Sequence, residues 1–238
     1  MKKLLAYVLV LSMGTASLIL GAAPATAAEI SGNVTLATDY RFRGISQGDR
    51  SPAIQGGFDL ETDSGFYLGT WASNVTFSGG AMELDVYGGF AGDISDDMGF
   101  DVGAIYYAYP EADSDPDLDY WEIYGSLSFW DATVGLNYSP DYFAETDTYF
   151  YLYGDYSLPL GENFSVDFHV GWNMFDSKED GAAFGIGDED EYFDYSVGIS
   201  TAAMGVDLSL AYIGTDVSSS DCPNICDDTV VFSVSKSL

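Results

Sequence analysis

A period of two runs through most of this sequence, and it limits the fold more than any other feature. From residue 30 onward, apolar side chains alternate with small or polar ones in segments of about ten residues. In residues 82–90, for example, Met82, Leu84 and Val86 alternate with Glu83 and Asp85. Such segments predict β-strands with one apolar face and one polar face, and twelve of them follow one another along the chain.

The connections between these segments fall into two kinds that alternate. Short turns are expected near residues 61–65, 92–98, 129–132, 158–163 and 202–205. Connections that are mostly longer or more polar are expected near residues 44–51, 76–81, 110–119, 139–147, 175–190 and 214–228. Short turns at one end and long loops at the other are typical of outer-membrane barrels.

Composition excludes two broad classes. Hydrophobic residues make up 47% of the chain and aromatic residues 16%, which is too much for a disordered protein. The chain has 38 acidic residues and only 7 Lys and Arg, so it lacks the clustered positive charge that binding to nucleic acid requires.

These observations predict an all-β protein, a closed antiparallel up-and-down transmembrane β-barrel of about twelve strands, with 10 to 14 possible. Backbone groups inside a bilayer find no water, so every strand must be paired on both sides and the sheet must close. Tyr40, Phe42, Trp71, Tyr106 and Trp121 are expected in belts at the membrane interface. The orientation of residues 66–77 and 148–158 stays open, because both faces carry aromatic residues.

Residues 1–28 have the composition of a cleaved signal peptide. Lys2 and Lys3 precede an apolar run, and small residues follow up to Ala28. The remaining residues, 29–238, would form the barrel domain, exported to the outer membrane. The last strand, which ends at Leu238, resembles the C-terminal signal that the barrel-assembly machinery recognises in outer-membrane proteins.

Two arginines stand out in so acidic a chain. Arg41 and Arg43 are spaced so that both would point into the barrel from the strand predicted over residues 30–43. They would face carboxylates on the inner wall, and the predicted pore-lining set is Asp39, Arg41, Arg43, Glu83, Asp85, Glu122, Asp167 and His169. One interpretation is a constriction whose field selects solutes, and the other is a set of structural ion pairs.

His169 is the single histidine, and it shares its face with Ser165 and Asp167. A hydrolase within the barrel wall is an alternative, but a wall histidine held by its polar neighbours is far commoner than a catalytic one, so we expect no enzyme. Cys222 and Cys226 are expected to form a disulfide that stiffens a loop tip. We expect no metal site and no cofactor.

Five segments together suggest a family: TDYRFRGISQ (38–47), PAIQGGFDLET (52–62), GFYLGTWASNV (65–75), ELDVYGGF (83–90) and IYYAYP (105–110). They resemble the TorF porin family, and the resemblance extends over residues 29–238. It implies an outer-membrane barrel of a Gram-negative bacterium and does not supply the solute.

The predicted function is therefore a porin or channel for the diffusion of small hydrophilic solutes or ions through an acidic lumen. The alternative is a structural or adhesive barrel that does not conduct. Its acidic loops, such as residues 113–119 and 188–191, would bind divalent cations or lipopolysaccharide. The expected partners are outer-membrane lipid, lipopolysaccharide and the solutes themselves, without nucleic acid.

Overall fold

The structure is a computed structural model. It describes residues 8–9, 16–17, 28–77, 80–110, 112, 115–161 and 163–238. Most of the predicted signal peptide, residues 1–28, lies outside the described residues.

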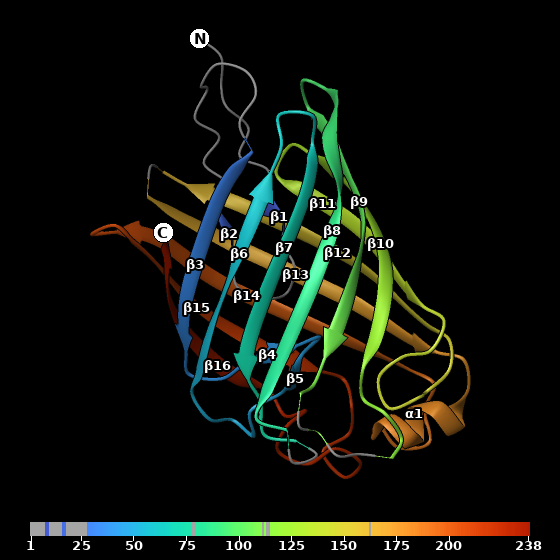
Figure 1. Ribbon diagram of the computed structural model, residues 1–238. Helices are drawn as coiled ribbons and strands as arrows, with labels where there is room; N and C mark the ends of the chain where they lie inside the picture. The colour runs from blue at the N-terminus through green and yellow to red at the C-terminus, as the bar shows by residue number, and fades with distance from the viewer. Residues whose placement is uncertain are drawn as a thin grey trace.

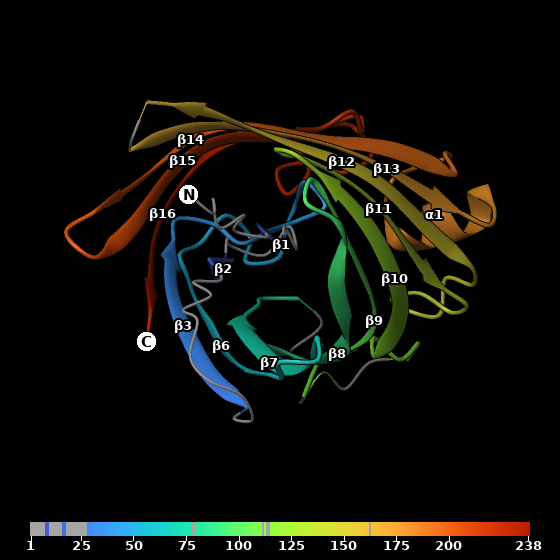
Figure 2. The same cartoon turned by 90° about the horizontal axis from the view of Figure 1, so that it is seen from above.

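Twelve antiparallel strands form one closed barrel, as predicted, and Figures 1 and 2 show it from the side and from above. Each strand pairs with its neighbours in the chain, and the first, β3, pairs with the last, β16. The strands are β3 (Glu29–Ala37), β6 (Ala53–Glu61), β7 (Phe66–Asn74), β8 (Met82–Ser95), β9 (Met98–Ala108), β10 (Tyr120–Phe129), β11 (Ala132–Ser139), β12 (Tyr149–Leu160), β13 (Phe164–Phe175), β14 (Glu191–Ala203), β15 (Val206–Thr215) and β16 (Thr229–Ser237).

The remaining elements are short. Strands β1 (Val8–Leu9) and β2 (Ala16–Ser17) pair with each other, and so do β4 (Arg41–Phe42) and β5 (Ile45–Ser46). Helix α1 (Lys178–Phe184) lies in the loop between β13 and β14. Among the described residues, no helix is long and apolar enough to cross a membrane.

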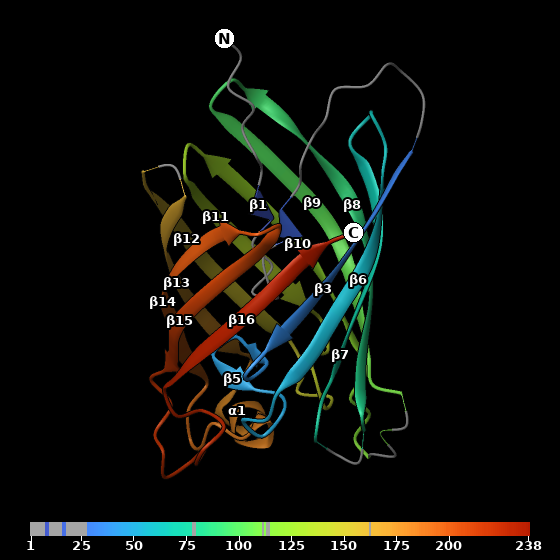
Figure 3. The ribbon, with the colours of Figure 1, turned by 90° about the vertical axis from the view of Figure 1, so that its left-hand side faces the viewer.

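Short and long connections separate to the two ends of the barrel, as the sequence predicts. Two residues join β8 to β9, β10 to β11 and β14 to β15. The opposite end holds the loop with β4 and β5, the loop with α1, and residues 216–228, in which a disulfide joins Cys222 to Cys226 (Figures 1 and 3). We call this the long-loop end.

Large apolar side chains cover the outside of the barrel. Ile30 is 72% exposed, Phe58 65% and Val102 50%, and such residues recur at every second position of the strands. A monomeric water-soluble protein rarely exposes so much apolar surface. Together with a sheet that has no free edge, this surface indicates a barrel that spans a membrane.

The predicted aromatic belts are partly wrong. Tyr106 and Trp121 are 45% and 44% exposed on the outside, whereas Tyr40, Phe42 and Trp71 are buried. These three belong to a cluster of buried, mostly aromatic side chains inside the long-loop end. The period of two could not distinguish the two environments, because an aromatic ring packs equally well against lipid and against other rings.

The first predicted strand, over residues 30–43, is also too long. Strand β3 ends at Ala37, and the chain then turns into the barrel as the β4–β5 hairpin. Gly44, at the turn of this hairpin, has a φ of +82°, and a Cβ on it would lie 2.5 Å from the side chain of Thr215. Only glycine fits so close an approach to the wall in this conformation.

Candidate pore constriction

The hairpin, residues 38–50, brings Asp39, Arg41 and Arg43 into the barrel interior. The sequence predicted these side chains on the inner wall of a strand, but they lie on the inserted hairpin instead. Arg41 Nε donates to Asp39 Oδ2 at 2.6 Å, and Ser46 Oγ donates to Asp39 Oδ1 at 2.7 Å. The first ion pair is therefore local to the hairpin.

Arg43 links the hairpin to the barrel wall. Its Nη2 donates to Glu122 Oε2 on β10 at 2.8 Å, and its Nη1 lies 2.8 Å from Glu122 Oε1. Four aromatic rings surround the guanidinium, with centroids at 4.7, 5.7, 5.0 and 4.3 Å from its central carbon: Phe42, Tyr142, Tyr149 and Tyr151. A planar, weakly hydrated cation suits such a setting, since it can pair with a carboxylate and stack on rings at once.

The hairpin crosses the lumen. Gly44 touches the ends of β14 and β15, and Arg43 reaches β10, which lies on the far side of the ring of strands. Tyr40 packs against Trp71 of β7 at 5.3 Å between ring centroids, and Phe42 packs against Tyr107 of β9 at 5.7 Å. The hairpin is therefore attached to several parts of the wall and narrows the barrel at its long-loop end.

Two predicted carboxylates of β8 lie beside the hairpin without pairing to its arginines. Glu83 accepts a hydrogen bond from the Tyr40 hydroxyl at 2.6 Å. Asp85 is fully buried, and neither of its oxygens has a hydrogen-bond partner among the described residues. Of the carboxylates expected to face the two arginines, Asp39 pairs with Arg41 and Glu122 pairs with Arg43, whereas Glu83 and Asp85 pair with neither.

Asp167 lies on the inner wall of β13 and is satisfied by hydroxyl groups. Its carboxylate accepts from Ser157 at 2.6 Å, from Ser165 at 3.1 Å and from Ser200 at 2.7 Å. These three serines lie on the strands β12, β13 and β14. The hydroxyl groups of the inner wall therefore satisfy the Asp167 carboxylate, which needs no further partner.

His169 lies between two carboxylates. Its Nδ1 is 2.7 Å from Asp155 and its Nε2 is 2.9 Å from Asp194, while the Tyr151 hydroxyl is 2.8 Å from Nε2. Both ring nitrogens can thus donate to a carboxylate, which favours the imidazolium and leaves no free base. No serine hydroxyl of the described residues contacts this ring.

Sequence reasoning missed Asp155 and Asp194, which hold His169 in place. Both are acidic residues within alternating strands, and this was the available signal, since a charge in a strand that spans the membrane must face the lumen. The open orientation of residues 148–158 hid Asp155. The structure settles that orientation, with Tyr149 and Tyr151 inside and Phe150 and Leu152 partly exposed outside.

Burial and neighbouring charges determine the protonation states of Arg43 in the hairpin and of Tyr142 beside it. Burial disfavours the charged form of Arg43, but the attraction of Glu122 outweighs it and raises the pKa of Arg43 well above its usual value. Burial raises the pKa of Tyr142, in the loop after β11, to about 12, although Arg43 acts in the opposite direction. Near neutral pH, Arg43 is therefore cationic and Tyr142 neutral.

A family model described as a bacterial protein of unknown function, Gcw_chp, matches residues 21–238. The chain belongs to the Gcw_chp family. No curated protein matches its sequence.

Among solved structures, the Gcw_chp chain resembles porins. The KdgM porin superposes with a TM-score of 0.56 at 9% sequence identity, covering 87% of this chain and 97% of the porin. A KdgM porin in complex with disordered oligogalacturonate gives 0.54 at 8% identity, with 87% and 96% covered. The NanC porin gives 0.52 at 8% identity, with 87% and 98% covered. At such identity the likeness establishes the fold, a closed barrel of the porin type.

Proposed function

We propose that this protein is an outer-membrane channel through which small hydrophilic solutes or ions diffuse. The closed barrel, apolar outside and polar inside, is the observation that carries this proposal. The likeness to KdgM and NanC and the resemblance to the TorF porin family support it. Twelve strands give an interior wider than that of an eight-stranded barrel and narrower than that of the sixteen-stranded porins.

We further propose that the channel favours cations. Six carboxylates of the strands are buried, or nearly so, on the lumen side: Glu83, Asp85, Asp101, Glu122, Asp155 and Asp194. The cationic side chains among them, Arg43 and His169, are already paired with carboxylates. A polyanion such as the oligogalacturonate bound to KdgM would be repelled by this wall, so we expect a different solute class here.

The experiment is conductance of the purified protein in planar bilayers. Altered migration after heating on a gel first establishes that the barrel is folded. We expect small conductance steps, because the hairpin narrows the lumen, and a reversal potential in a KCl gradient that indicates preference for K⁺. No conductance, or preference for Cl⁻, would contradict the proposal.

A second candidate is a structural or adhesive barrel that does not conduct. The packing of the hairpin against rings of β7, β9 and β12 favours it, since these contacts close much of the long-loop end. Deletion of the gene would then weaken the cell surface without changing solute uptake. A deletion strain with intact surface and reduced uptake would favour the channel.

The hydrolase alternative has its own test. It requires that replacement of His169 by Ala abolish a lipid-cleaving activity of the native barrel. The contacts of His169 with Asp155 and Asp194 speak against it, because they occupy both ring nitrogens.

The partners follow from the proposed location in the outer membrane. The apolar exterior would contact lipid and lipopolysaccharide, and the barrel-assembly machinery would recognise the last strand. Divalent cations at the acidic loops belong to the same proposal. Among the described residues, no group of three His, Cys, Asp or Glu side chains could hold a metal ion, so such binding would be weak.

A further inference from the structure

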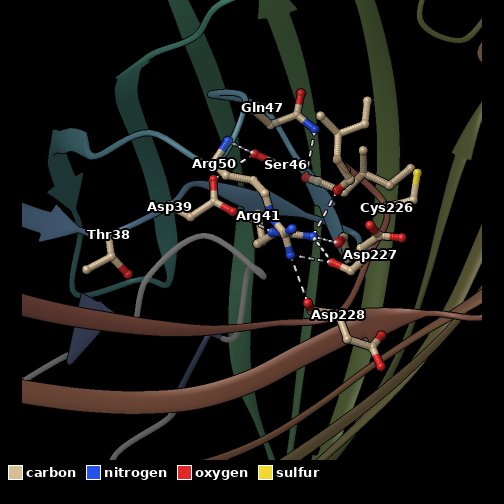
Figure 4. Close-up of polar contacts among 12 residues, drawn as sticks. Thr38, Asp39, Arg41, Ser46, Gln47, Arg50, Cys226, Asp227 and Asp228 are labelled. Carbon is tan, nitrogen blue, oxygen red and sulfur yellow. Dashed lines mark hydrogen bonds and ion pairs between the residues drawn. The ribbon is translucent and has the colours of Figure 1, made fainter. Parts of the chain in front are cut away.

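Besides the barrel wall, the hairpin binds one loop, residues 216–228, between β15 and β16. Figure 4 shows this contact. Arg41 Nη1 donates to the backbone oxygens of Ile225 at 2.9 Å and Asp227 at 3.1 Å. Ser46 donates its backbone N–H to the same Ile225 oxygen at 2.9 Å. Both strands of the hairpin therefore bind this loop.

Arg50, at the exit of the hairpin, adds a second pair of contacts. Its Nη2 donates to the backbone oxygens of Asp227 at 3.2 Å and Asp228 at 2.8 Å. Three of the five Lys and Arg of the described residues belong to the hairpin, and two of them, Arg41 and Arg50, bind carbonyl groups of this loop. These hydrogen bonds form only when the carbonyl groups of the loop point toward the hairpin, so they depend on the backbone conformation of the loop.

The disulfide sets that conformation. Cys222 and Cys226 close a ring of five residues that contains Ile225, and both cysteines are buried in the cluster inside the long-loop end. The carbonyl of Cys226 accepts from Thr215 Oγ1 at 3.1 Å, which ties the ring to the end of β15. The ring thus holds the Ile225 carbonyl that Arg41 and Ser46 bind, and it positions the two residues that directly follow it, Asp227 and Asp228, whose carbonyls bind Arg41 and Arg50.

We propose that the disulfide-closed loop 216–228 is a latch that helps to keep the hairpin inside the barrel mouth, and that opening the disulfide raises the fraction of molecules in which the hairpin leaves the mouth and the channel is wider. The widening rests on the proposed function, whereas the movement of the hairpin does not. Reduction by a dithiol breaks the S–S bond and leaves two protonated thiols, while the dithiol is oxidised to its own disulfide.

Trypsin gives a readout of the hairpin that needs no conduction. It cuts after Lys and Arg, and Arg41 and Arg43 are 5% and 2% exposed, so the latched hairpin should resist cleavage there. Lys178, whose side chain is 53% exposed in another loop, serves as the internal reference. The measured quantity is the rate of cutting after Arg41 and Arg43, relative to that after Lys178, in folded protein in detergent.

We expect the double variant Cys222→Ser, Cys226→Ser to raise this relative rate about tenfold, because cleavage follows the population of the open form. Arg50→Gln, which keeps the disulfide and removes two of the contacts, should raise it about threefold. Ser220→Ala is the matched control, since Ser220 bonds Ser218 within the loop and does not touch the hairpin. The control should match the wild type.

Equal relative rates in the wild type, the serine double variant and Arg50→Gln would overturn the latch. If the double variant does not fold, Arg50→Gln and dithiothreitol treatment of folded wild type, with thiol formation verified by alkylation, decide instead. Faster cleavage together with larger conductance supports both proposals. Faster cleavage with no conductance in any form supports the latch and contradicts the channel.

Discussion

The pair between Arg43 and Glu122 offers the sharpest test of the constriction. We consider Arg43→Met, which keeps an unbranched apolar chain among the four rings but removes the charge. Glu122 then stays fully buried with Asn137, at 2.8 Å, and Tyr107, at 3.4 Å, as its hydrogen-bond donors. Two neutral donors do not replace a guanidinium that contacts both carboxylate oxygens.

The expected magnitude follows from burial. Breaking a buried ion pair by removing one partner destabilises a protein by about 3 to 5 kcal/mol. The guanidinium also loses its interaction with the rings, which is about 2 kcal/mol when desolvated. Replacing both partners by apolar residues is often neutral, so Arg43→Met with Glu122→Leu should regain most of the loss. The two substitutions should therefore be strongly non-additive.

The assay is denaturant unfolding of the barrel in detergent micelles, followed by tryptophan fluorescence, for the wild type, both single variants and the double variant. A variant can release its hairpin from the barrel without unfolding, and the measured loss in the free energy of unfolding is then smaller. Tryptic cleavage after Arg41 is therefore followed in parallel. The reasoning is refuted if each single variant loses less than about 1 kcal/mol, the range of a surface pair, with cleavage unchanged. Additive effects in the double variant would refute it as well.

Three further predictions concern the lumen. Asp85→Asn should leave the thermal midpoint unchanged or raise it, because neither carboxyl oxygen of Asp85 has a hydrogen-bond partner among the described residues that the substitution could remove. Asp167→Asn should lower the midpoint, with a loss of stability of about 1 to 3 kcal/mol, because it disturbs three serine hydrogen bonds. A lower midpoint for Asp85→Asn alone would count against this. Arg41→Ala with Arg43→Ala should shift the reversal potential further toward cations, and an unchanged potential would assign both arginines to structure. Conductance should be constant between pH 7 and 9 and rise only above about pH 10. The pKa of Tyr142 is raised to about 12 in the folded protein, from about 10 in the unfolded chain. The contribution of Tyr142 to hairpin stability is therefore complete below about pH 10 and is lost as the pH rises through the folded pKa. A rise between pH 7 and 9 would show that another group controls the hairpin.

The sequence by itself determined the barrel. Strict alternation over segments of about ten residues, with short and long connections in turn, leaves few alternatives, because the period assigns each side chain to one face and a bilayer permits strands only in a closed sheet. The same rule placed Glu83, Asp85, Glu122, Asp167 and His169 on the lumen side, where the structure has them.

Only the tertiary structure decided what fills the mouth of that barrel. The pattern of alternation continued past Ala37 into RFRG, so nothing local showed that the chain leaves the wall there. The insertion depends on contacts between residues far apart in sequence, such as Arg43 with Glu122 and Arg41 with Ile225. A period describes the surroundings of a strand, whereas a loop is positioned by whichever distant partners satisfy its charges and rings.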